Sequence, residues 1–374
     1  MKLTTNLAAA LFIASVAPAL AQNGGTASAK PAAARVVAAE TTAAAFKDKN
    51  WKAPRTSWGQ PSLEGVWSTD DVRGVPLNRP EGDGRNETAT AEEFAARVNQ
   101  EGSGQDQLAD NPFLKHDFGT RIFGYSSLVV DPPDGRVPKL TPHGAALAKK
   151  RVLGTFGAGP FDKLEDFSLY DRCVTRGVLG SILPVIYGNG LRIAQSPSSV
   201  AISYEMIHDT RVIPLDSNEP SDPRLRQWLG VPRGHWDGDT LVVVTTSFTD
   251  RTSVGINGGP PPNSEQLTLT ERFKRVDPQM IEYRATVDDP GAFAGPFTIR
   301  LMITSRPDYE TYEYSCHEGN NAVRLGLSGE RVYERKVAEA KARGLPIPAR
   351  ATQHNQIRNG PTEGAKVFNI NEGE

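Results

Sequence analysis

The chain contains very little cysteine, since only Cys173 and Cys316 occur among its 374 residues. It has no Cys-x-x-Cys pair and no His-x-x-x-His, so the recognised ligand spacings of zinc sites are missing. The glycines follow no phosphate-loop or dinucleotide pattern, and no Gly-x-Ser-x-Gly is present. These absences argue against a nucleotide-binding fold and against a serine hydrolase of the α/β type.

Neither sign of charge is in excess, because 42 lysines and arginines stand against 44 aspartates and glutamates. The two signs are interspersed along the chain, which argues against a nucleic-acid partner and against a polybasic membrane-binding role. With 35 glycines, 28 prolines and only 4 methionines, the composition favours an all-β or loop-rich protein over a helical bundle.

The first 21 residues have the pattern of a secretory signal peptide. Lys2 supplies the positive end, a short apolar run follows, and Ala19-Leu20-Ala21 is a small-x-small cleavage site. The apolar run is too short to span a bilayer, and no cysteine follows the cleavage site to carry a lipid. We therefore expect a periplasmic or secreted protein without a membrane span. Residues 22–50 are rich in Ala, Thr, Ser and Gly and are expected to be a disordered leader.

The two cysteines are expected to form a disulfide, because the chain is predicted to enter an oxidising compartment. Closing so long a loop would stabilise the fold by roughly 3 to 5 kcal/mol on the chain-entropy description. Two free thiols, or a metal-bound thiolate, are the alternatives that the sequence leaves open.

Residues 51–165 are predicted to be a loop-rich N-terminal part with short elements. Gly65-Val66-Trp67 indicates a short strand, and a helix is expected to follow Thr90. Leu128 to Asp131 forms a compact apolar strand that ends at two prolines. Thr141-Pro142 opens a helix that runs to Lys150 and Arg151, with proline at its first position and basic residues near its end.

Residues 166–345 carry the pattern of an antiparallel meander. Strands separated by short turns must be antiparallel neighbours, and Asp237-Gly238-Asp239 is a strong hairpin signal. We expect the meander to close into a lipocalin-like barrel, with a sandwich as the alternative. A C-terminal helix is predicted from Ser328 to Arg343, and residues 346–374 are expected to be a disordered tail. The expected strands are Leu191–Gln195, Val200–His208, His235–Trp236, Thr240–Phe248, Leu267–Val276, Met280–Val287, Phe297–Ser305 and Thr311–His317.

Several motifs in fixed order resemble a broad group of uncharacterised secreted bacterial proteins. The motifs are Asp171-Arg172-Cys173, Tyr204 to Asp216 (YEMIHDTRVIPLD), Arg233 to Val243 (RGHWDGDTLVV), Thr270 to Phe273 (TERF) and Tyr314 to Asn320 (YSCHEGN). The resemblance covers roughly residues 167–329. It implies a secreted, β-rich domain and brings no activity or catalytic residue with it.

Three polar clusters could carry chemistry. They are Asp171-Arg172 beside Cys173, the group of Glu205, His208, Asp209 and Arg211, and His317-Glu318 with Asn320 beside Cys316. The alternation from Val200 to Asp209 places Tyr204 and His208 on one face of the expected strand and Glu205 and Asp209 on the other. A disulfide would bring the first and third clusters together, because bonded cysteines have Cα atoms about 6 Å apart.

General acid–base catalysis is the chemistry that these residue types favour. We expect His317 and His208 to transfer protons with Glu205 and Glu318 as carboxylate partners. Arg172 and Arg211 would hold an anionic group, with Asp171, Tyr204 and Asn320 completing the binding site. The alternative is that Glu205 with Arg211, and Asp171 with Arg172, are structural ion pairs at a barrel rim. A metal site on His208 and His317, with Asp209 or Glu318, is a further alternative, although their spacing is not a recognised motif.

The sequence therefore predicts a secreted or periplasmic enzyme, a lyase, isomerase or hydrolase, that acts on a small organic molecule in a barrel cavity without an organic cofactor. One alternative is a non-catalytic carrier of an apolar or aromatic ligand. Metal-dependent catalysis and a structural role in the cell envelope are the others. The substrate and the oligomeric state do not follow from the sequence.

Overall fold

The structure is a computed structural model. It describes residues 51–81, 87–96, 123–153, 159–185, 187–216, 222, 224–305, 309, 311 and 313–350. The predicted signal peptide, the leader at 22–50 and the tail beyond residue 350 lie outside the described residues. No helix in the described ranges is long and apolar enough to cross a membrane.

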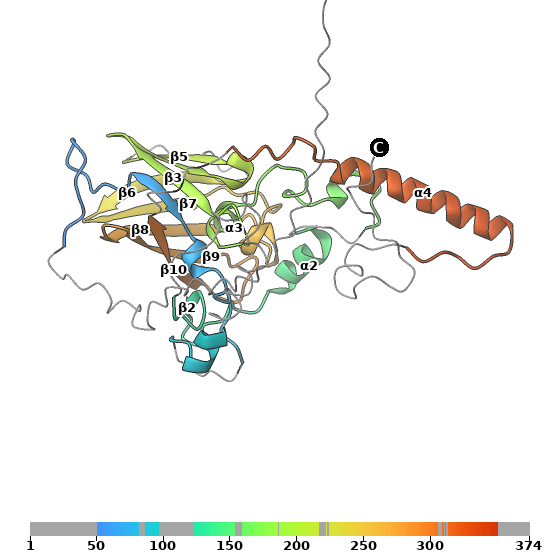
Figure 1. Cartoon of the computed structure of the whole chain (residues 1–374), viewed down its shortest axis with the longest axis horizontal. Coiled ribbons are helices and arrows are strands. Elements are labelled where there is room, and N and C mark those ends of the chain that lie inside the picture. Colours follow the sequence, from blue (N-terminus) through green and yellow to red (C-terminus); the bar gives the residue numbers. More distant parts are fainter. Residues whose placement is uncertain are drawn as a thin grey trace, which may run out of the picture. The chain divides into compact units, whose positions relative to one another are not determined.

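The described chain is built on one antiparallel sheet that nearly closes into a barrel (Figure 1). The strand order is β5-β4-β3-β1-β10-β9-β8-β7-β6, and β2 pairs with β10 beside this path. A parallel bridge between Leu215 and Gly234 joins the two ends of the sheet. The prediction of a mainly β, barrel-like fold with a C-terminal helix is thus confirmed. The strands are β1 (Gly65–Ser68), β2 (Val129–Asp131), β3 (Gly190–Gln195), β4 (Ser199–Tyr204), β5 (Thr210–Pro214), β6 (Val231–Asp237), β7 (Thr240–Thr246), β8 (Thr268–Asp277), β9 (Met280–Asp288) and β10 (Phe297–Ser305).

The hairpins follow from their turn residues. Gly238 joins β6 to β7 with φ +58°, a backbone conformation that glycine adopts without steric cost. The β8–β9 hairpin turns at Pro278-Gln279, as the sequence indicates. Along the strands, buried and exposed side chains alternate, so one face of the sheet packs on a continuous apolar core.

The topology differs from a single meander in one respect. β1, from the N-terminal part, lies between β3 and β10, where Val66 pairs with Arg192 and Trp67 pairs with Ser305. The sheet therefore consists of two meanders, β3 to β5 and β6 to β10, that β1 joins. This pairing is far apart in the sequence, and no turn signal announces it.

Two of the expected strands are wrong. β4 ends at Tyr204 instead of continuing to His208, because the chain turns at Met206–His208, where Ile207 and His208 have positive φ values. No strand occurs among the described residues between positions 311 and 317. β10 is already paired on both sides, with β9 and with β1, so it offers no free edge to a further strand. That stretch ends instead in a turn, in which the Glu318 amide donates to the Ser315 carbonyl at 3.0 Å.

The helices confirm most of the capping signals. α2 (Pro142–Lys150) begins where Thr141 Oγ1 accepts from the Gly144 amide at 3.0 Å, and α3 (Val178–Ile182) is short and entirely buried. α4 (Ala322–Ala342) starts six residues before the predicted Ser328, so the expected start is wrong. The Ala322 amide instead donates to the side chain of Asn320 at 3.1 Å.

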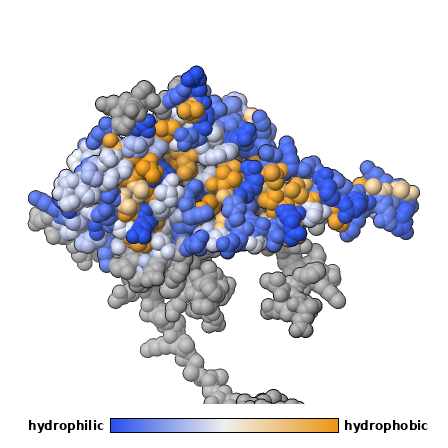
Figure 2. All heavy atoms as spheres, turned by 90° about the horizontal axis from the view of Figure 1, so that it is seen from above, coloured by the Kyte–Doolittle hydropathy of each residue, from blue (hydrophilic) through white to orange (hydrophobic). Residues whose placement is uncertain are grey.

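The surface of α4 is mixed in character, and Figure 2 shows hydrophobic and hydrophilic residues side by side along it. Leu325 and Val332 are its exposed large apolar side chains. After the helix, Gly344 has φ +63°, as expected for a residue that ends a helix.

Candidate functional site

Two of the predicted site residues, Arg211 and Tyr204, lie inside the barrel. Arg211 of β5 forms a two-pronged ion pair with Glu271 of β8, with N···O distances of 2.6 and 3.0 Å. Tyr283 of β9 donates to the same carboxylate at 3.1 Å, and Arg211 also reaches Tyr204 and Thr245 at 3.3 Å each. The five side chains come from five strands, so they fill the interior at this level.

Burial controls the ionisation of this interior cluster. Desolvation raises the pKa values of Tyr204 and Tyr283, so both hydroxyls stay protonated. For Arg211, desolvation acts to lower the pKa, but the adjacent Glu271 carboxylate outweighs it and the pKa is raised. The Arg211–Glu271 pair is therefore a structural ion pair. It replaces the expected pairing of Arg211 with Glu205.

The disulfide between Cys173 and Cys316 is present, with a Cα–Cα distance of 5.8 Å, and confirms that prediction. It joins the first and third polar clusters. The Thr175 hydroxyl donates to Asp209 Oδ2 at 2.6 Å and joins the first cluster to the second. All three clusters therefore meet where β4 ends and β5 begins.

The turn between β4 and β5 is strained. Ile207 and His208 have φ values of +64° and +48°. A β-branched residue in this region is a steric outlier, and such strain is concentrated at functional sites. The turn places Glu205 against the Tyr309 hydroxyl, which donates a short hydrogen bond to Glu205 Oε2. At its other end it places Asp209 against Thr175.

The pKa of the Asp209 carboxyl is raised. Desolvation by burial raises its pKa, while the hydrogen bond from Thr175 and the nearby His208 lower it, and the net shift is upward. The two carboxyls of the turn are therefore both held by hydroxyl groups, and one of them is held in a setting that favours its protonated form.

The remaining predicted residues lie on the loops around the disulfide. His208, His317, Glu318 and Asn320 are exposed. Asn320 has a structural role, since its side chain donates to the Asp171 carbonyl at 3.0 Å and accepts from the first amide of α4. Asp171 caps the turn at Ser168, accepting from the Ser168 amide at 3.2 Å.

The two histidines do not form the expected partnerships with carboxylates. Within the described ranges, neither His208 nor His317 is hydrogen-bonded to an acid, and His208 Nδ1 lies 2.7 Å from the carbonyl of Ile207. Arg172 is half-buried and donates to the Ser168 carbonyl at 3.4 Å. No group of three His, Cys, Asp or Glu side chains able to hold a metal ion occurs in the part of the chain that the structure describes.

Arg176 is the site residue that the sequence did not single out. Its side chain is 1% exposed, yet Nε, Nη1 and Nη2 have no hydrogen-bond partner among the described residues. Burial lowers the pKa of Arg176 to about 10, and the groups that act against this effect are four tyrosines, Tyr170, Tyr187, Tyr204 and Tyr314. A buried guanidinium without a carboxylate is uncommon, because burying an unpaired charge is costly.

The tyrosines near Arg176 include Tyr170, Tyr187 and Tyr314. The Tyr170 hydroxyl donates to Met206 Sδ at 3.6 Å, and Tyr314 and Tyr187 add to the effect of desolvation in raising the pKa of Tyr170. Desolvation by burial raises the pKa values of Tyr170 and Tyr314, so their hydroxyls are neutral at ordinary pH. They therefore do not balance the charge of Arg176.

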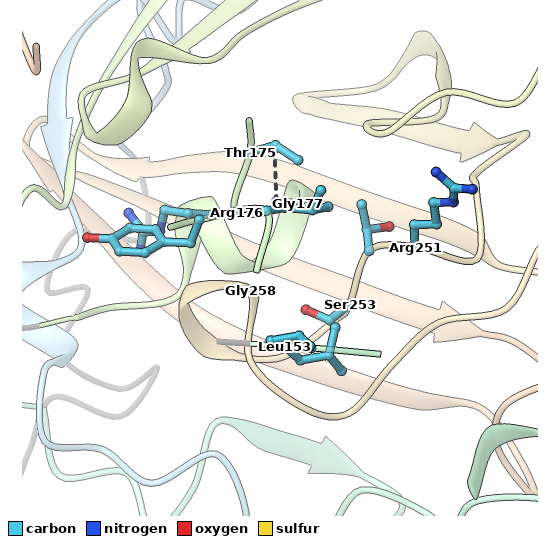
Figure 3. Close-up of a pocket in the computed structure, with 11 residues that line it drawn as sticks. Leu153, Thr175, Arg176, Gly177, Arg251, Ser253 and Gly258 are labelled. Carbon is cyan, nitrogen blue, oxygen red and sulfur yellow. Dashed lines mark hydrogen bonds between the residues drawn. The ribbon is translucent and has the colours of Figure 1, made fainter. Parts of the chain in front are cut away.

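A small pocket opens beside Arg176 (Figure 3). The pocket as a whole has room for little more than one water-sized group. In Figure 3, Arg176 lies on one side of the pocket and Arg251 lies on the opposite side, with Leu153 and Ser253 below. Val152, Leu153 and Leu169 give the lining an apolar share.

Glycines keep this pocket tight. Gly177, at the start of α3, has φ +76°, and its amide donates to Thr175 at 3.0 Å. A Cβ on Gly180 would lie 2.6 Å from the amide nitrogen of Gly258, so α3 and the segment at Gly258 pack backbone to backbone. The sequence signal for this region was an arginine and a glycine directly before a short apolar run.

Comparisons of the chain with family models, with curated proteins and with solved structures find no match. The site is thus described by its own geometry. It combines two carboxyls on a strained turn with neutral tyrosine hydroxyls, a small pocket and a buried arginine that has no hydrogen-bond partner among the described residues. Carboxyls and hydroxyls can exchange protons with a bound molecule, and a guanidinium can hold a negative charge.

Proposed function

We propose that the protein is a secreted enzyme that performs general acid–base chemistry on a small organic molecule, as a lyase, isomerase or hydrolase. The reaction would take place at the end of the barrel, where β4 ends and β5 begins. The single observation that carries the proposal is the strained turn, which fixes Glu205 against Tyr309 and Asp209 against Thr175. The predicted signal peptide and the disulfide support the secreted location.

The proposed roles follow from the surroundings of each carboxyl. Asp209, whose pKa is raised mainly by desolvation, is the proposed acid, because its protonated form persists closer to neutral pH. Glu205 is the proposed base, with the Tyr309 hydroxyl as its proton relay. His208 is exposed on the same turn and can carry protons between this site and the solvent.

The proposed reaction takes place outside the barrel lumen. The side chains of Arg211, Glu271, Tyr204, Tyr283 and Thr245 occupy the interior at their level. A carrier with its ligand deep in the barrel would need that space. A carrier would therefore bind its ligand at the same surface site, and it would differ from the enzyme only in lacking turnover.

Proton NMR in D₂O tests the proposal with a set of compounds in place of a single chosen substrate. A panel of esters, lactones, hydroxy acids and enolisable ketones reports hydrolysis, elimination and carbon–hydrogen exchange in one measurement. We expect one compound class to change in the presence of the wild-type protein. Glu205→Gln and Asp209→Asn should each lower the rate by about 100-fold or more, the size that proton-transfer groups contribute.

Asp237→Asn is the matched control, because Asp237 is an exposed carboxyl in the β6–β7 hairpin. Its Oδ2 atom forms an exposed contact of 3.4 Å with Arg272 Nη1. The variant should leave the rate unchanged. Loss of turnover in His317→Ala, with turnover retained in both carboxyl variants, would restore the histidine assignment and refute this one. Binding of a compound without any turnover across the panel would favour the carrier.

A further inference from the structure

We infer that Arg176 is the anion-binding group of this site and that its ligand carries a carboxylate. The inference deepens the proposed function, on which it rests for the position of the reacting groups. It concerns a residue that is absent from the three polar clusters of the sequence.

Two buried arginines differ in how their charge is balanced. Arg176 and Arg211 are 1% and 3% exposed. Arg211 has its own carboxylate, Glu271, in a two-pronged contact, whereas all three side-chain nitrogens of Arg176 are without a partner among the described residues. The described residues thus supply the counter-charge for Arg211 and none for Arg176, which a bound molecule could complete.

The surroundings of Arg176 favour a bound anion. The groups that favour its charged form are tyrosines, and the raised pKa values of Tyr170 and Tyr314 keep their hydroxyls neutral and able to donate hydrogen bonds. A bound anion would therefore meet a positive charge and hydrogen-bond donors, and no carboxylate among the described residues is hydrogen-bonded to the guanidinium. A carboxylate matches the planar fork of arginine with two parallel hydrogen bonds.

The pocket carries the third step, because it limits the size and character of the ligand. The enclosed space of the whole pocket is small, about one water-sized group, which favours the flat head of a carboxylate over a tetrahedral phosphate. Val152, Leu153 and Leu169 provide apolar contacts for the rest of the molecule. The ligand class is therefore a small monocarboxylate with an apolar or aromatic body.

Isothermal titration calorimetry of the full-length mature protein tests this inference, with benzoate and hexanoate as probes. Benzamide and hexanamide have nearly the same shape without the charge, and inorganic phosphate is the tetrahedral anion. We expect at least one of the two acids to bind, and to bind at least tenfold more tightly than its amide and more tightly than phosphate. Arg176→Met should remove this preference for acid over amide.

Arg335→Met is the matched control, because Arg335 is an exposed arginine of α4 that does not line this pocket. It should keep the preference for acids. Arg176→Gln is the second variant, should the methionine variant not fold. Equal binding of acids and amides, tighter binding of phosphate, an acid preference that survives without Arg176, or no binding of any probe would overturn the inference.

The failure of this inference can be distinguished from the failure of the proposed function. Asp209→Asn and Glu205→Gln should still bind the acids, because neither residue supplies the charge that Arg176 does. Acid binding through Arg176 without turnover of any compound would refute only the enzyme proposal. Turnover that does not depend on Arg176 would refute only the anion site.

Discussion

Replacing Arg176 with methionine should stabilise the ligand-free protein. The pKa of this buried arginine falls from 12.5 to about 10, mainly through desolvation. A tenfold change in an equilibrium constant corresponds to about 1.4 kcal/mol, so burying the charged form costs about 3 kcal/mol. Methionine fills a similar elongated space without a charge. The expected gain in the free energy of unfolding is therefore positive, with about 3 kcal/mol as its upper limit.

The pH dependence of this gain follows from the sign of the shift. A base whose folded-state pKa is lowered makes the folded protein less stable at every pH at which the group is charged. The cost should be fully present below about pH 10 and should decline only as the pH rises towards the unfolded value. The difference between wild type and Arg176→Met should thus be constant across the neutral range.

Urea unfolding at pH 7, in a buffer that contains no carboxylate, measures the effect from the midpoint at constant slope. Arg211→Met is the matched control, because it makes the same substitution at an arginine that is equally buried. It leaves Glu271 as an unpaired buried charge, so it should destabilise the protein by about 3 to 5 kcal/mol. If both variants lose stability to the same extent, Arg176 has a partner in the folded protein and the reasoning fails.

Two further predictions concern the same end of the barrel. Because the folded-state pKa of Asp209 is raised, its contribution to stability should be greatest below about pH 4 and should be lost as the pH rises through the raised value. Urea midpoints between pH 4 and 7 should show a smaller decline in Asp209→Asn, and an unchanged profile would contradict the burial argument. The disulfide closes a separation of 143 residues, so the Cys173→Ser/Cys316→Ser variant should lose about 5 kcal/mol on the chain-entropy description. Denaturation of the wild type and of the double variant under non-reducing conditions measures this loss. A loss below about 1 kcal/mol would show that the loop is held by other contacts.

Local signals in the sequence were sufficient to predict most of the strands and hairpins of the sheet. Asp237-Gly238-Asp239 predicts the β6–β7 hairpin because glycine adopts the positive φ that the turn requires. Thr141-Pro142 predicts the start of α2 for an equally local reason. The position of β1 between β3 and β10 could not be predicted in this way, because it depends on pairing between residues more than 100 positions apart.

The errors at the site have two physical causes, and both depend on the folded structure. The alternation from Val200 to Asp209 fits a strand, but the chain turns at Ile207 in a conformation that its residue type disfavours. The disulfide prediction did bring the three clusters together, and Thr175 completed the link to Asp209. Arg176 could not be predicted because its distinguishing feature is the absence of a hydrogen-bond partner among the residues that the structure describes. That feature is visible only when the tyrosines around it are in place.

The most direct test of the proposed chemistry is proton NMR in D₂O on the compound panel, with wild type, Asp209→Asn and Asp237→Asn compared at equal concentration. We expect wild type and Asp237→Asn to convert or exchange the same compound at the same rate, and Asp209→Asn to be at least about 100-fold slower. Equal rates in all three proteins, or no change in any compound, would contradict acid–base catalysis at the β4–β5 turn.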